Sequence, residues 1–138
     1  MLKAHRSLTC QLLQIVKPYN EDQAKYLLGI LNSSLIAYYF RKMYNRQDKT
    51  FPEIRIYELR SLPIRTIDFS SSEEKTQHDK LVALEDNMLE LQKKYHEARM
   101  DLDKELYERQ IKIVDAQIDG LVYDLYGLTE EVKVVGGV

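Results

Sequence analysis

The chain of 138 residues is long enough for one domain, or for a compact unit with a protruding element. Its composition, 44% hydrophobic and 30% charged residues with five glycines and three prolines, is that of a folded soluble protein rather than a low-complexity chain. No apolar run has the length of a membrane span, no signal-peptide pattern follows Met1, and the single Cys10 excludes an intrachain disulfide framework. We therefore expect a cytoplasmic protein.

Charge divides the chain into two parts. Residues 1–65 carry eleven Lys and Arg against five Asp and Glu, whereas residues 66–138 carry nine against seventeen. The net charge of −2 is therefore the sum of +6 for residues 1–65 and −8 for residues 66–138. This asymmetry indicates that the two parts face different environments, with the basic part suited to phosphate, although uneven charge also arises by chance in small domains.

The first part of the chain predicts a strand followed by a helix. Residues 7–16 form a short apolar run that ends before Pro18, which is typical of a strand. Asn20 is suited to begin a helix, and apolar residues recur at helical spacing from there to about Tyr44. The apolar stripe is wide enough to predict packing on more than one side, with Gly29 at a place of close approach.

The next segment predicts a loop, a second strand and a linker. Residues 41–50 are polar and basic and lack periodicity, so we expect a loop. Apolar residues alternate with Arg and Tyr over 54–60, which favours a second short strand or extended segment. Residues 70–74 are three serines and two glutamates, which is typical of a linker that runs into a helix.

The second part of the chain contains two heptad patterns that fall out of register near residues 99–103. We therefore predict two long helices, antiparallel and joined by a tight turn, with Asp101 or Asp103 capping the second helix and Gly127 ending it. One continuous helix of about 50 residues is the alternative. The predicted seam between the helices consists of Leu84, Met88, Leu91, Ile111, Val114 and Ile118.

No residue pattern indicates catalysis or metal binding. The chain has no Gly-rich phosphate loop, and His5, His78 and His96 are far apart in the sequence. The acidic residues of the two long helices occupy solvent-facing heptad positions, and Asp115 and Asp119 fit helix–helix polar contacts better than acid–base chemistry. We predict that the chain is not itself an enzyme.

The basic segment that follows the first predicted helix has a pattern suited to DNA. Arg and Lys supply phosphate contacts, and Arg can also read base edges, whereas a solvated basic loop is the alternative explanation. We predict DNA-binding roles for Arg41, Lys42, Arg46, Lys49, Thr50 and Arg55.

The order of several short motifs carries a family resemblance. The motifs are Tyr-Leu-Leu-Gly-Ile-Leu-Asn-Ser at 26–33, Tyr-Tyr-Phe at 38–40, Lys-Thr-Phe-Pro-Glu-Ile-Arg-Ile at 49–56, Leu-Arg-Ser-Leu-Pro-Ile at 59–64 and Ile-Asp-Gly-Leu-Val-Tyr-Asp-Leu-Tyr-Gly-Leu-Thr-Glu-Glu at 118–131. Together they resemble the C-terminal specificity domain, or target-recognition domain, of type IIG restriction-modification enzymes and related adenine-specific DNA methyltransferases.

The resemblance implies a division of labour between this chain and its parent enzyme. In the family, a separate N-terminal domain binds S-adenosylmethionine and methylates adenine, and this domain recognises the DNA sequence. The methylase signature Asn-Pro-Pro-Tyr does not occur here, so no cofactor is expected in this chain. The implied partners are double-stranded DNA and the methyltransferase domain, with a homodimer through the helical hairpin as a further possibility.

These observations combine into one expected architecture. We predict an α+β chain, with a small helix-and-strand unit at 1–68 that belongs to the DNA-recognition region, a helical hairpin at 73–132 and a frayed tail at 133–138. Two rival interpretations are a coiled-coil interaction or dimerisation module without DNA contact, and an enzyme fragment that contributes residues to another chain's active site.

Overall fold

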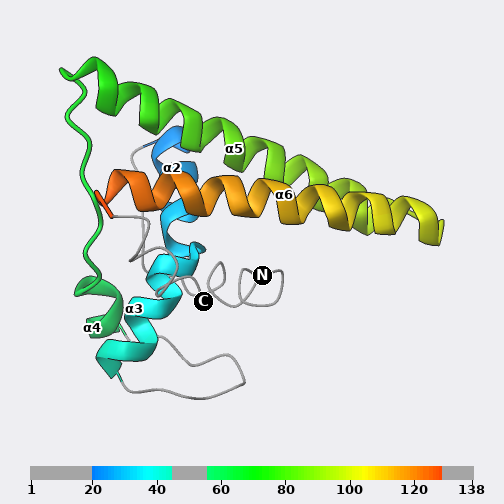
Figure 1. Cartoon of the computed structure of the whole chain (residues 1–138), viewed down its shortest axis with the longest axis horizontal. Coiled ribbons are helices and arrows are strands. Elements are labelled where there is room, and N and C mark those ends of the chain that lie inside the picture. The colour runs from blue at the N-terminus through cyan, green and yellow to red at the C-terminus, as the bar shows by residue number, and fades with distance from the viewer. Residues whose placement is uncertain (1–19, 45–55, 129–138) are drawn as a thin grey trace.

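The computed structural model describes residues 20–44 and 56–128, and within these ranges it contains helices and no β-strand. None of the described helices is long and apolar enough to cross a membrane. Figure 1 shows the two longest helices side by side and the shorter ones near one end of that pair. The helices are α2 (Glu21–Leu31), α3 (Ser34–Tyr44), α4 (Ile56–Arg60), α5 (Ser72–Glu97) and α6 (Asp101–Leu125).

The predicted α+β class is wrong, because the described part of the chain is all-helical. The second predicted strand, at 54–60, overlaps α4, which forms one helical turn from Ile56 to Arg60. Apolar and polar residues alternate over too few positions there to distinguish a strand from a helical turn, and a strand also needs a neighbouring strand to pair with. The first predicted strand, at 7–16, lies outside the described residues.

The long helix predicted from Asn20 to Tyr44 is two helices. Asn20 caps α2 as predicted, since its side chain accepts a hydrogen bond from the Gln23 backbone N–H at 2.8 Å. The helix then ends at Leu31, and the buried Ser33 hydroxyl donates to the Ile30 carbonyl at 2.6 Å. Short polar side chains that bond to nearby backbone in this way compete with continued helix, which explains the break.

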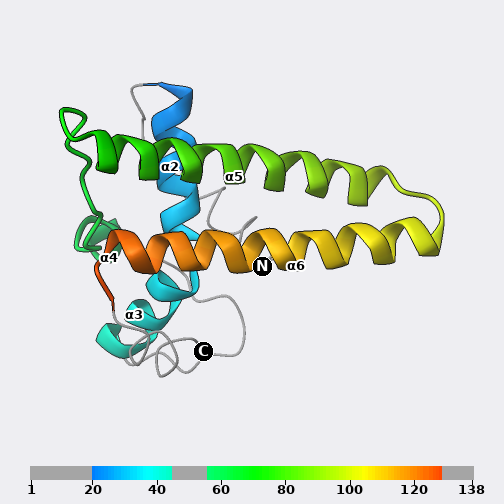
Figure 2. The same ribbon diagram turned by 45° about the horizontal axis from the view of Figure 1, so that its top comes forward.

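Helices α5 and α6 form the predicted antiparallel hairpin, joined by residues 98–100 (Figures 1 and 2). Helix α5 begins after Ser71, whose side chain accepts from the Glu74 backbone N–H. The prediction that Asp101 or Asp103 caps α6 is wrong: Met100 is the N-cap residue and makes no side-chain cap bond. Both aspartates lie in the first turn instead, where they complement the helix dipole.

Gly127 ends α6, as predicted. Its φ of +64° is left-handed, which glycine adopts without strain. The Leu128 N–H donates to the Tyr123 carbonyl at 3.1 Å, and the Gly127 N–H donates to the Asp124 carbonyl at 3.0 Å. This pair of bonds is the Schellman motif, and it satisfies carbonyls that the end of a helix would otherwise leave unpaired.

The hydrophobic core lies where α2 crosses the hairpin. Ile30, Leu81, Met88 and Val122 are completely buried there. Gly29 allows the close approach that was predicted, because a Cβ at this position would meet a Leu81 side-chain carbon at 2.9 Å. Any larger residue would therefore force the Leu81 side chain or α2 itself to shift.

The hairpin extends well beyond the part that α2 covers. Figures 1 and 2 both show α2 and α3 against one half of the α5–α6 pair, while the half that contains the turn projects away from the other described helices. Within the described part of the chain, the hairpin therefore has a proximal half that α2 and α3 cover and a distal half that no other described helix covers.

Candidate nucleic-acid interface

Two of the predicted DNA-binding residues lie together at the end of α3. Arg41 and Lys42 are exposed in its last turn, and the Lys42 ammonium lies over the Tyr38 ring, 5.7 Å from the centroid. Cations at a helix C-terminus complement the negative end of its dipole. Figures 1 and 2 show α3 running away from the hairpin, so these two charges stand apart from the acidic helices.

The other end of α3 is fixed by the hairpin. The Asp119 carboxylate of α6 accepts from the Ser34 backbone N–H at 2.8 Å and from the Ser34 hydroxyl at 2.7 Å. An aspartate that caps a helix N-terminus normally comes from the adjacent sequence, but here it comes from 85 residues away. Asp119 therefore makes the helix–helix polar contact that was predicted, and it orients α3 through a bond that sequence spacing could not identify.

The inner side of α3 packs into the core. Ile36 and Phe40 are buried, while Arg41 and Lys42 are exposed on other sides of the helix. The helix therefore presents its cations outward from a fixed base. The remaining predicted DNA-binding residues, Arg46, Lys49, Thr50 and Arg55, lie outside the described residues.

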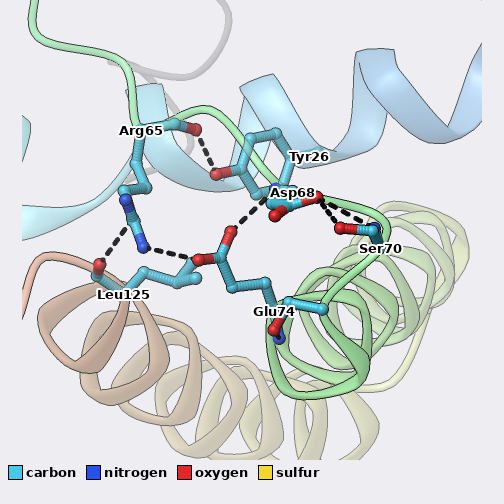
Figure 3. Close-up of polar contacts among 7 residues, drawn as sticks. Tyr26, Arg65, Asp68, Ser70, Glu74 and Leu125 are labelled. Atoms are coloured by element: carbon cyan, nitrogen blue, oxygen red, sulfur yellow. Dashed lines mark hydrogen bonds and ion pairs between the residues drawn. The ribbon is translucent and has the colours of Figure 1, made fainter.

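Arg65 has a structural role in the described structure (Figure 3). Its guanidinium donates to the Leu125 carbonyl at the end of α6, at 3.1 Å, and pairs with the Glu74 carboxylate of α5 at 3.2 Å. Glu74 in turn accepts from the Asp68 backbone N–H at 2.7 Å. This network ties the segment between α4 and α5 to both helices of the hairpin, so the Arg65 charge is already engaged.

Two tyrosines complete the same junction. The Tyr26 hydroxyl of α2 donates to the Arg65 carbonyl, and the Tyr126 hydroxyl donates to the Pro63 carbonyl while accepting from the Arg65 N–H. Burial raises the pKa of both phenols, so both stay neutral and keep donating at physiological pH. The segment that follows α4 is thereby held against the hairpin by backbone contacts.

The predicted seam residues lie between the two helices of the hairpin. Met88, Leu91, Ile111, Val114 and Ile118 are buried in the core cluster, and Leu84 is partly buried against it. Lys80, Ala83, Leu84, Asn87, Gln117 and Leu121 line an open groove of about 420 Å³ between the helices.

Glu85 is a buried carboxyl that the sequence pattern did not single out. It is 2% exposed on α5, and its Oε2 atom has no hydrogen-bond partner. Burial, followed by the nearby charges of Asp115 and Asp86, raises the pKa of Glu85 to about 7. Its place in the heptad, four residues after Leu81, is the signal that could have found it.

In the described part of the chain, no group of three or more His, Cys, Asp or Glu side chains is placed to hold a metal ion. The cations at the end of α3 lie in a segment of the chain that matches a protein-family model. Residues 4–64 match the TaqI-like C-terminal specificity domain. Neither the curated proteins nor the solved structures contain a significant match to the chain.

The match confirms the family resemblance for the basic part of the chain. The TaqI-like segment includes α2, α3 and α4, and it ends one residue before Arg65. It does not include the hairpin, so the motif at 118–131 stays a resemblance drawn from its residues alone. The matched segment and the hairpin are thus joined at the Arg65 junction.

Proposed function

We propose that this chain is the non-catalytic DNA-recognition module of a prokaryotic, cytoplasmic restriction-modification methyltransferase. One observation carries the proposal: the segment that matches a specificity domain is also the basic segment of the chain. Residues 4–64 contain nine Lys and Arg against five Asp and Glu. Positive charge concentrated on the recognition unit is what attraction to a phosphate backbone requires.

The arrangement of α3 supports direct DNA contact. Arg41 and Lys42 are exposed on a helix whose other end Asp119 holds in place, so their positions are fixed relative to the core. Lysine supplies phosphate contacts, whereas an arginine fork can also bond to the O6 and N7 atoms of guanine. Arg46, Lys49, Thr50 and Arg55 extend this basic set in the sequence, and we propose that they bind DNA as well.

Methyl transfer belongs to another part of the parent enzyme in this proposal. The chain lacks the Asn-Pro-Pro-Tyr signature, so S-adenosylmethionine would bind a separate methyltransferase domain. The acidic hairpin is suited to contact protein rather than DNA, because residues 66–138 carry a net charge of −8. The methyltransferase domain is the partner that the family resemblance implies for it.

A second candidate function is a protein-interaction module without DNA contact. The observation that favours it is the set of large apolar side chains exposed on the distal hairpin, which includes Leu102 at 72% and Ile113 at 59%. Soluble proteins seldom leave such residues aligned on one helix without a partner. DNA binding by the full chain distinguishes this candidate from the first.

Fluorescence anisotropy with a labelled duplex tests the proposal. Replacing Arg41 and Lys42 together with alanine should weaken binding by about tenfold, since each lost phosphate contact removes a counterion-release contribution. The matched control replaces Lys93 and Lys94, two exposed lysines of α5, and should leave the affinity unchanged. Equal effects of both variants would show that the affinity for DNA depends on net charge alone and that α3 does not contact the duplex.

A further inference from the structure

A second heptad pattern runs along the outer side of α6, away from α5. Leu102, Leu106, Arg109, Ile113 and Ala116 follow one another at intervals of four, three, four and three residues, and all are exposed. They occupy the side of the helix opposite the buried Ile111, Val114 and Ile118, because 100° separates successive residues. We call this set the outer seam.

The outer seam has the residues of an interface and no partner among the described elements. Leu102, Leu106 and Ile113 are 72%, 50% and 59% exposed, and they lie on the distal half of α6, which projects from the body (Figures 1 and 2). A 3–4 repeat of apolar residues is the pattern by which one helix packs against another. The partner that fits is therefore a helix.

We propose that the outer seam binds the outer seam of a second copy of this chain, with the two α6 helices antiparallel. In this arrangement Leu102 faces the partner's Ile113 twice, by two-fold symmetry. Glu105 and Lys112, which flank the seam on one side, then face each other across the interface in both directions. The two copies are thus complementary in charge along the seam.

Arg109 selects the antiparallel direction. It is exposed at the centre of the seam and is paired with Glu105 one turn earlier in its own helix. A parallel pair would place Arg109 directly opposite the partner's Arg109, which brings like charges together in the middle of the interface. The antiparallel register places Arg109 beside the partner's Leu106 and near the partner's Glu105.

The same register explains the exposed residue at the tip of the hairpin. Met100 is 65% exposed, and the antiparallel pairing brings it level with the partner's Ala116, next to Gln117. Gln117 lines the open groove between α5 and α6, together with Leu84 and Leu121. A flexible methionine is suited to fill an irregular apolar groove of this kind.

Sedimentation velocity of the full chain without DNA tests this dimer, so its outcome is separate from that of the DNA-binding proposal. The chain should form a dimer with a dissociation constant in the micromolar range or weaker, because the apolar contact is short. Replacing Leu106 and Ile113 with glutamate should abolish the dimer. The control Leu89→Glu replaces an exposed leucine of α5 outside the seam and should dimerise like the parent.

Charge reversal checks the register without removing apolar contacts. Glu105→Lys and Lys112→Glu should each weaken the dimer about tenfold, since each places like charges opposite one another twice. The chain that carries both changes should recover the parent affinity. A monomer at every concentration, or a dimer that responds to neither the glutamate pair nor the charge reversals, would overturn the proposal and assign the seam to another partner.

Discussion

At the scale of single residues, long-range polar contacts decide how α3 and the segment after α4 are held against the hairpin. Asp119 and Arg65 each connect segments that are at least 60 residues apart in the sequence, except for the Arg65 contact with Glu74. Each acts on a helix end, where backbone groups lack partners within the helix: Asp119 accepts at the start of α3, and Arg65 donates at the end of α6. Charged residues at these points therefore stabilise the fold and are not free for a ligand.

We predict that Asp119→Ala destabilises the chain by about 1–3 kcal/mol, because it removes a charged acceptor from two hydrogen bonds at the start of α3. Urea unfolding measures the loss, and hydrogen exchange of the first α3 amides shows whether it is local. The matched control is Asp103→Ala, which removes an exposed aspartate from the same helix. Equal stability of the two variants would contradict the role of Asp119.

Glu85 predicts a pH dependence of stability. Its folded-state pKa of about 7 lies above the ordinary value of 4.5, so the folded chain holds a proton that the unfolded chain releases. Stability should therefore fall as the pH rises from about 4.5 to 7 and change no further above that range. Glu85→Gln should remove this fall and stabilise the chain at pH 8 by about 1–3 kcal/mol.

Thermal or urea unfolding at pH 4 and pH 8 measures this effect. At pH 4 the glutamine variant and the parent should differ little, because Glu85 is protonated in both states of the parent. The control is Glu90→Gln, an exposed position on the same helix that should show no such pH-dependent gain. If the Glu85→Gln variant were less stable than the parent at pH 8, the inference that burial disfavours the charged form of Glu85 would be contradicted.

At the scale of elements, the hairpin was predicted well from its heptad spacing, whereas the short segments were predicted poorly. The repeat covers about four turns of α5, from Leu81 to Tyr95, and about five turns of α6, from Tyr107 to Leu125, so many residues agree on one structure. Residues 54–60 offer only a few alternating positions, and the helix at Ile56–Arg60 satisfies the same pattern. The break at Ser33 was missed because the apolar residues keep their helical spacing across it, whereas a single short side chain that bonds to nearby backbone ends the helix.

For the candidate site, the sequence predicted the basic composition but not the position of each cation. Arg41 and Lys42 were selected because they begin a basic run, and the structure places them in the last turn of α3 rather than in the predicted loop. Arg65, which the same charge pattern includes, is engaged at the hairpin junction instead. A cation's sequence neighbourhood does not reveal whether a distant carbonyl or carboxylate already binds it.

The buried side of the hairpin gives a prediction about its stability. Ile111→Asp should destabilise the chain by several kcal/mol, since Ile111 is 9% exposed and an aspartate there would be an unpaired charge in the α5–α6 contact. The matched control is Ile113→Asp, two residues away and 59% exposed, which should melt within a degree or two of the parent in dilute solution. Equal melting temperatures for the two variants would contradict the assignment of the seam.

At the scale of the whole molecule, the described residues form a short-helix unit from the basic part of the chain and a projecting hairpin from the acidic part. The segment at 4–64 matches a specificity domain, and the Arg65 junction joins it to helices whose outer seam is suited to a second copy. A dimer through that seam would present two recognition units from one assembly. Dimeric DNA-binding proteins with two-fold symmetry often bind paired half-sites, so the proposed dimer is compatible with the proposed recognition role.

The salt dependence of DNA binding tests the central claim most directly. Each phosphate contact contributes a slope of roughly −0.9 to log affinity against log salt, so three or four contacts predict a slope near −3. Fluorescence anisotropy across a salt series compares the full chain with the Arg46→Ala, Lys49→Ala variant and with the Lys93→Ala, Lys94→Ala control. The proposal predicts a slope shallower by about two units for the first variant only. Unchanged affinity and an unchanged slope for that variant would contradict it.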